Sequence, residues 1–93
     1  MTPTHATDTN VIMHEDGRIT PIAPKNGTQY TLEELQGFVG GFIELVPMSK
    51  DRYAVVNEEG QFLGFDLNPG ASMMLDCVIL GPCVVVPRKA MGD

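Results

Sequence analysis

The stretch from Tyr30 to Val46 reads YTLEELQGFVGGFIELV, and it holds a helix start, a helix period and a helix stop in succession. Thr31 and Glu34 have the spacing of a capping box, in which each side chain bonds a backbone N–H that the helix leaves free. The apolar residues of 32–39 recur at spacings of three and four, which is typical of a helix with one buried face. The stretch therefore predicts a helix over residues 31–39.

Glycines divide this stretch into its parts. Gly37 lies inside the helix at a cost of about 1 kcal/mol relative to Ala, and we interpret it as a point of close approach by another backbone. Gly40 is expected to end the helix in the left-handed conformation, and Phe42–Val46 to follow as a strand. A helix of about nine residues is too short to be stable alone in water, so it must pack on a sheet.

Short apolar segments predict the strands of that sheet. Val11–Met13 and Arg18–Ile22 flank Asp16-Gly17, a dipeptide that favours a tight hairpin turn. Pro21 lacks a backbone N–H, which restricts the second segment to a sheet edge.

The second half of the chain contains further apolar segments. Arg52–Asn57 and Gln61–Leu67 are expected to pair as a hairpin, with Gly60 at positive φ in the turn. Cys77–Leu80 and Cys83–Val86 are continuous apolar runs, which suit one central strand with an irregular start or two short strands joined by a bend.

These elements predict an α+β fold: a small antiparallel sheet of four to six short strands, with one main helix at about residues 31–39 packed on one face. Residues 11–87 form the single domain, and residues 1–10 and 88–93 are expected to be tails. Because a chain of this length has a thin core, we expect it to self-associate, most simply as a dimer.

Composition limits the function classes. The net charge is −6, which argues against direct nucleic acid binding. No run of about 18 apolar residues and no signal-peptide pattern is present, which predicts a cytoplasmic protein without membrane contact. His5 and His14 have no ligand-like neighbours, so we expect no metal, no cofactor and no catalytic residues. Cys77 and Cys83 are interpreted as buried reduced thiols.

Two polar junctions are the candidate binding sites, and their residues are Asn57, Glu58 and Glu59 in the first and Asp66, Asn68 and Ser72 in the second. Asn at such positions is more often a turn residue that bonds local backbone than a ligand contact. The expected strand between the junctions separates them by roughly 23 Å. The junction at Asn68 is favoured, because Pro69 and Gly70 are expected to keep its backbone irregular and its polar groups exposed.

The ordered motifs NG, YTLEELQ, VGG, IE, VNEEG and LN, between Asn26 and Asn68, resemble a family of small phage- and plasmid-borne proteins known only as a domain of unknown function. The resemblance covers roughly residues 16–86. Asp66 departs from it, since we expect Pro before the Leu-Asn pair. The resemblance implies a bacterial or phage cytoplasmic setting and carries no enzyme activity.

The leading hypothesis is a non-catalytic interaction protein, such as a phage or mobile-element accessory factor that binds a host protein through an acidic face or a sheet edge. A second hypothesis is capture of a small nucleotide-like ligand in a pocket near a protomer interface. A third is a small enzyme, and a fourth is a purely structural or assembly role.

Overall fold

A computed structural model describes residues 10–91 of the 93-residue chain. The elements in chain order are β1 (Val11–Met13), β2 (Ile19–Pro21), α1 (Leu32–Val39), β3 (Ile43–Ser49), β4 (Arg52–Asn57), α2 (Pro69–Leu75), β5 (Cys83–Pro87) and η2 (Arg88–Ala90), a short 3-10 helix. The α+β class expected from the sequence is confirmed.

The five strands form one antiparallel sheet in the order β2-β1-β5-β4-β3. All residues of β5 are buried, which confirms that the apolar run at its position is a central strand covered on both faces. β1 and β2 form the expected hairpin, with Gly17 at φ 93°. β2 lies at the sheet edge, where the missing N–H of Pro21 is tolerated.

The ends of α1 are as the sequence predicts. The backbone N–H of Glu34 donates to the Thr31 hydroxyl at 3.1 Å, and the Thr31 N–H donates to the Glu34 carboxylate at 2.9 Å. Gly40 ends the helix at φ 81°. The interpretation of Gly37 is wrong, because no heavy atom beyond its own helix and chain neighbours lies within 4 Å of a Cβ placed there.

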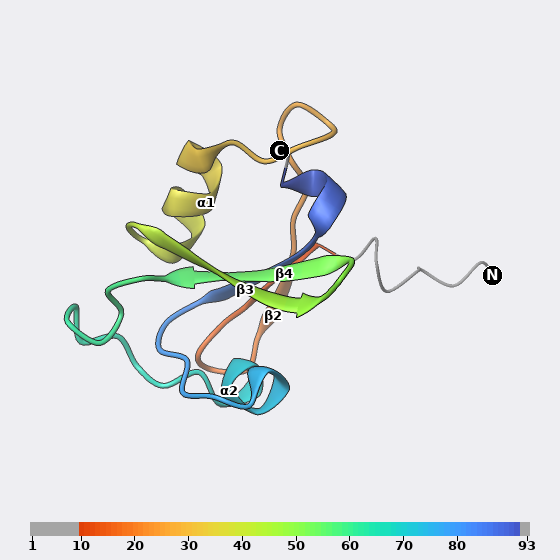
Figure 1. Cartoon of the computed structure of the whole chain (residues 1–93). Coiled ribbons are helices and arrows are strands. Elements are labelled where there is room, and N and C mark those ends of the chain that lie inside the picture. The colour runs from red at the N-terminus through yellow and green to blue at the C-terminus, as the bar shows by residue number, and fades with distance from the viewer. Residues whose placement is uncertain (1–9, 92–93) are drawn as a thin grey trace.

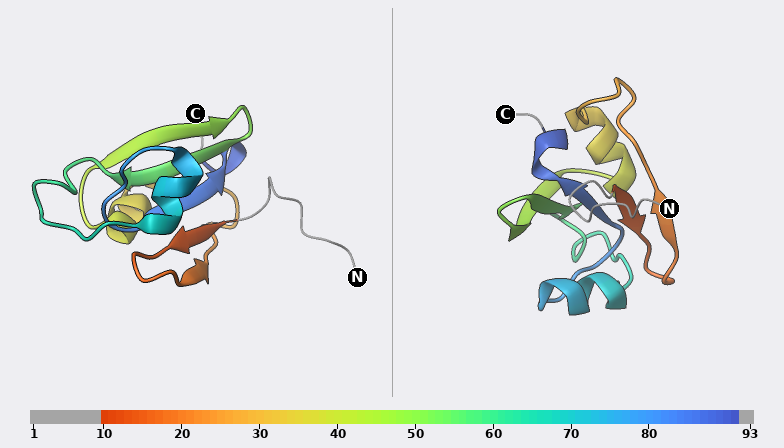
Figure 2. Two further views of the ribbon diagram at one scale, coloured as in Figure 1. Left: turned by 90° about the horizontal axis from the view of Figure 1, so that it is seen from below. Right: turned by 90° about the vertical axis from the view of Figure 1, so that its right-hand side faces the viewer.

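The sheet is covered on both faces (Figure 1), so the core has two halves. On the α1 side the buried cluster comprises Ile12, Tyr30, Leu35, Val39, Val55, Val84, Val86 and Ala90. On the α2 side it comprises Ala54, Val56, Ala71, Ile79, Cys83 and Val85. The right-hand view of Figure 2 shows α1 and η2 on one side of the strands and α2 on the other. The alternation of inward side chains along β4 and β5 divides them between the two halves.

Residues 61–67 do not form the expected strand. β4 already pairs with β3 on one side and β5 on the other, so it has no free edge. The chain instead turns over residues 58–64, and Leu67 makes a single bridge to Leu80. Gly60 is not at positive φ. It is buried, and a Cβ there would lie 3.0 Å from the Leu80 carbonyl oxygen, so close backbone approach is the reason for this glycine.

Two further segments differ from expectation. Residues 77–80 form no strand apart from the Leu80 bridge. Arg88–Ala90 is not a tail, because it forms η2 with Ala90 buried, and the Ala90 carbonyl accepts a 2.8 Å hydrogen bond from the Tyr30 N–H. His5 and the rest of the expected N-terminal tail, apart from Asn10, lie outside the described residues.

Candidate functional site

Asn68, the favoured binding residue, lies inside the fold. It is 1% exposed. Its Nδ2 donates to the carbonyls of Met13 and Gly81, both at 2.9 Å, and its Oδ1 accepts from the Ala71 N–H at 3.1 Å. The expected exposure is wrong because Pro69 is the first residue of α2 rather than part of an open loop, and Pro is well suited to that position.

Asn57 and Ser72 also support the backbone. The buried Asn57 donates to the Val39 carbonyl at 3.0 Å and accepts from the Glu59 N–H at 2.7 Å. The Ser72 hydroxyl accepts from the Ile79 N–H at 2.8 Å. These two side chains join α1 and α2 to neighbouring turns, which is the local backbone role that the sequence also allows.

The remaining predicted residues, Glu58, Glu59 and Asp66, are exposed carboxylates. Of these three residues, Glu58 lines a groove that Asn57, another of the predicted site residues, also lines. That groove has a volume of about 560 Å³, and Asp66, Asn68 and Ser72 do not line it. Because residues 61–67 form no strand, the two polar junctions are not the ends of one strand, and the first of them contributes Asn57 and Glu58 to this groove.

The groove lies between the α2-side face of β3 and β4 and the turns at residues 58–61 and 77–80. Val46, Val56 and Ile79 supply its apolar lining, and the carboxylates of Glu44 and Glu58 its charge. Apolar walls with a few polar groups are typical of recognition sites.

Exposed apolar side chains are concentrated beside this groove. Six of the ten large exposed hydrophobic residues in the described part of the chain lie between positions 62 and 78: Phe62, Leu63, Leu67, Met73, Met74 and Val78. We call the outer face of residues 58–80 the 58–80 surface. Its residues lie on two turns and on α2, and Figure 1 shows these segments together below and beside the sheet.

The same surface is acidic. Glu58, Glu59, Asp66 and Asp76 are all exposed, and residues 53–87 include no Lys, Arg or His. This gap in the basic residues is visible in the sequence and could have identified the surface. The exposure of the six apolar side chains could not be predicted from the sequence, because an apolar residue in a turn can face either the core or solvent.

The two cysteines are free and differ in exposure. Cys83 is in the core, and burial raises its thiol pKa to about 12, so it stays protonated at neutral pH. Cys77 is exposed and lines the groove. The interpretation of both as buried thiols is therefore correct for Cys83 and wrong for Cys77.

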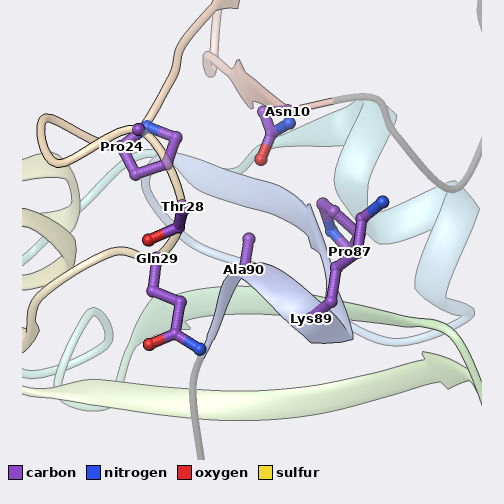
Figure 3. A pocket seen from close by; sticks show the side chains of 8 residues that line it. Asn10, Pro24, Thr28, Gln29, Pro87, Lys89 and Ala90 are labelled. Atoms are coloured by element: carbon purple, nitrogen blue, oxygen red, sulfur yellow. The ribbon is translucent and has the colours of Figure 1, made fainter.

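A second groove lies on the α1 side, near the C-terminal end of β5 (Figure 3). Its volume is about 410 Å³, and the neutral polar side chains of Asn10, Thr28 and Gln29 line it together with Pro87 and Lys89. The Tyr30 hydroxyl donates to the Asn10 side chain at 3.1 Å. Burial raises the Tyr30 pKa to about 12, with a smaller effect from Glu34.

Residues 10–91 contain no group of three or more His, Cys, Asp or Glu side chains that could hold a metal ion. Within the same range, every helix is too short or too polar to cross a membrane.

The fold and its surfaces define a small α+β domain with helices on both faces of an antiparallel sheet and an acidic, partly apolar surface beside a groove. The chain belongs to the family described as Domain of unknown function (DUF3846), whose model matches residues 9–93. No curated protein and no solved structure matches the chain.

Proposed function

We propose that this chain is a non-catalytic interaction protein whose 58–80 surface binds a partner protein with basic and apolar side chains. The observation that carries the proposal is the exposure of Phe62, Met73 and Val78, at 87%, 84% and 75% respectively. A group of large exposed apolar side chains surrounded by polar residues is typical of protein interaction sites.

The charge of the surface selects the partner. Glu44 in the groove and the four carboxylates of the 58–80 surface face solvent with no basic residue between positions 53 and 87. Such a field accelerates association with a basic surface and disfavours acidic ones. The apolar side chains then supply the contact area, and the groove receives side chains of the partner.

The sheet edge is a weaker candidate. The Glu58 N–H donates to the Phe42 carbonyl, and antiparallel pairing alternates, so Ile43, Leu45 and Pro47 direct their backbone groups away from β4. Pro47 has no N–H to offer. Proline on an edge strand blocks the addition of another strand, and the opposite edge, β2, carries Pro21.

The proposed setting comes from the resemblance to phage- and plasmid-borne proteins. It supports a host protein in the bacterial cytoplasm as the partner. Because a protein of this role needs only a surface, its chemistry is recognition rather than turnover.

A cross-linking and affinity experiment tests this function. A photoactivatable residue at position 62 identifies the partner, which is then purified and titrated by calorimetry. Phe62→Ser and Met73→Ser should each weaken binding about tenfold, which corresponds to about 1.4 kcal/mol. Raising the salt concentration should also weaken it, because salt screens surface charges.

Leu32→Ser is the matched control. Leu32 is 58% exposed but lies on α1, on the other side of the sheet. Its replacement should leave the affinity unchanged. An equal loss in Leu32→Ser, or full affinity in both Phe62→Ser and Met73→Ser, would show that the partner binds elsewhere.

A further inference from the structure

The positive charge of this acidic chain is concentrated at one end. Lys50, Arg52, Arg88 and Lys89 are four of its six basic residues. Two lie at the β3–β4 turn and two directly follow β5, and the Arg88 N–H joins these segments by donating to the Asp51 carbonyl at 2.7 Å. This contact brings two pairs of basic residues that are far apart in the sequence close together, and Asp51 is the one acidic residue in these two short segments.

Three of these cations line one cavity. Its volume is about 440 Å³, and its lining is Lys50, Asp51, Pro87, Arg88 and Lys89. The guanidinium of Arg88 lies over the Tyr53 ring, 5.0 Å from its centroid, which fixes its position beside the cavity. No carboxylate of the described residues lies within 4.0 Å of the charged nitrogens of Lys50 or Arg88. Lys50 and Arg88 together outweigh the single carboxylate of Asp51 in the cavity lining, so the cavity attracts an anion.

A neutral polar groove adjoins this cavity. The groove of Figure 3 shares Pro87 and Lys89 with it, and its opposite wall carries Thr28 and Gln29. Figure 3 shows Thr28 and Gln29 on one side of the groove and Pro87 and Lys89 on the other. Hydroxyl and amide groups both donate and accept hydrogen bonds, which suits an uncharged polar group such as a sugar or a base.

We propose that the cationic cavity and the adjoining groove together bind a phosphorylated small molecule of mononucleotide size. Lys50 and Arg88 bind the phosphate by charge-assisted hydrogen bonds, and Thr28 and Gln29 bind its uncharged portion. Both volumes, about 440 and 410 Å³, lie in the range of small-molecule sites. The site is independent of the 58–80 surface and uses none of its residues.

The test is a titration of the full chain, followed by NMR and calorimetry, with inorganic phosphate, AMP and adenosine as probes. AMP should bind at least tenfold more tightly than either inorganic phosphate or adenosine, because only AMP occupies both cavities. Lys50→Gln and Arg88→Gln should each weaken AMP binding about tenfold. Thr28→Val should weaken AMP binding but leave phosphate binding unchanged.

Arg18→Gln is the charge-matched control, since Arg18 is exposed on the β1–β2 hairpin and paired with Asp16 at 2.8 Å. It should not change AMP affinity. Lys50 is exposed, so its replacement should not disturb the fold. Lys50→Gln therefore tests the proposal even if Arg88→Gln disturbs the packing on Tyr53. The proposal is overturned if Arg18→Gln and Lys50→Gln lose the same AMP affinity, or if the chain does not bind AMP at millimolar concentration. It is also overturned if AMP and phosphate bind with equal affinity, or if a single-stranded oligonucleotide binds more tightly than AMP.

Discussion

Gly81 holds a backbone conformation that side chains rarely adopt, at φ 88°. A Cβ at this position would also lie 2.5 Å from Cδ2 of Phe65. Gly81→Ala should therefore lower the free energy of unfolding by roughly 2 kcal/mol. Urea unfolding measures this change, and wild-type stability in the variant would contradict it.

Gly37→Ala is the opposite case and the control. Gly37 lies in the middle of α1 with open space around it, so alanine should raise the stability by about 0.5–1 kcal/mol through helix propensity. Comparing Gly81→Ala with Gly37→Ala distinguishes a glycine that the fold requires from one that alanine can replace.

Asn68 joins three parts of the molecule through hydrogen bonds to β1, to the turn at Gly81 and to the first turn of α2. Asn68→Ala removes the helix cap, worth about 1 kcal/mol. It also removes the donor to the buried Gly81 carbonyl and to the partly buried Met13 carbonyl, at about 1–3 kcal/mol. We expect a loss of about 3 kcal/mol in thermal or urea unfolding. Asp66→Ala, at an exposed carboxylate, should change stability by less than about 0.5 kcal/mol. If the two variants unfold alike, the hydrogen bonds of Asn68 do not stabilise the fold.

At the scale of elements, α1 makes the stability depend on pH. Hydrogen bonds from the backbone N–H groups of Thr31 and Lys25 lower the pKa of Glu34 below its ordinary 4.5. Because the pKa of Glu34 is lower in the folded chain than in the unfolded chain, the ionised Glu34 stabilises the fold above pH 4.5. This stabilisation is lost as the pH falls below 4.5. In Glu34→Gln, which keeps an acceptor but does not titrate, the melting temperature should fall less steeply between about pH 5 and pH 3 than in the wild type.

Glu33→Gln is the control, because it removes the same charge from the same helix turn without touching the capping box. Its pH profile should remain steeper than that of Glu34→Gln. Identical slopes in both variants would contradict the role of the capping box.

Elements whose signals are local could be predicted from the sequence. The capping box at Thr31, the stop at Gly40 and the hairpin at Gly17 each depend on a few adjacent residues, and the structure has all three. The hairpin expected at 58–60 failed for a non-local reason. Residues 61–67 carry apolar residues like a strand, but both sides of β4 are taken by β3 and β5, and β5 comes later in the chain.

The candidate site shows the same division. The carboxylates at Glu58, Glu59 and Asp66 are exposed, as polar letters in turns indicate. The burial of Asn57 and Asn68 could not be predicted, because their partners Val39, Met13 and Gly81 lie 13–55 residues away along the chain. The cationic end likewise depends on a contact between residues 51 and 88.

The whole molecule is electrically polarised. Residues 53–87 carry four carboxylates and no basic residue, whereas residues 50–52 and 88–89 carry four basic residues and one acid. This arrangement supports two separate binding regions, one for a basic protein and one for a phosphorylated small molecule. Self-association stays a prediction, and the proline in each edge strand, Pro21 and Pro47, disfavours dimers formed by joining the two sheets edge to edge.

Amide hydrogen–deuterium exchange shows where the partner binds, when it is measured on the free chain and on the chain with the purified partner that cross-linking has identified. We expect the largest slowing of exchange in residues 58–80 on binding, a smaller effect in β3, which contributes Glu44 and Val46 to the groove, and no change in α1. Protection confined to residues 43–49 would show that the partner pairs with the sheet edge instead, and protection confined to α1 would place it on the opposite side of the sheet. Either result would show that the 58–80 surface is not the binding site.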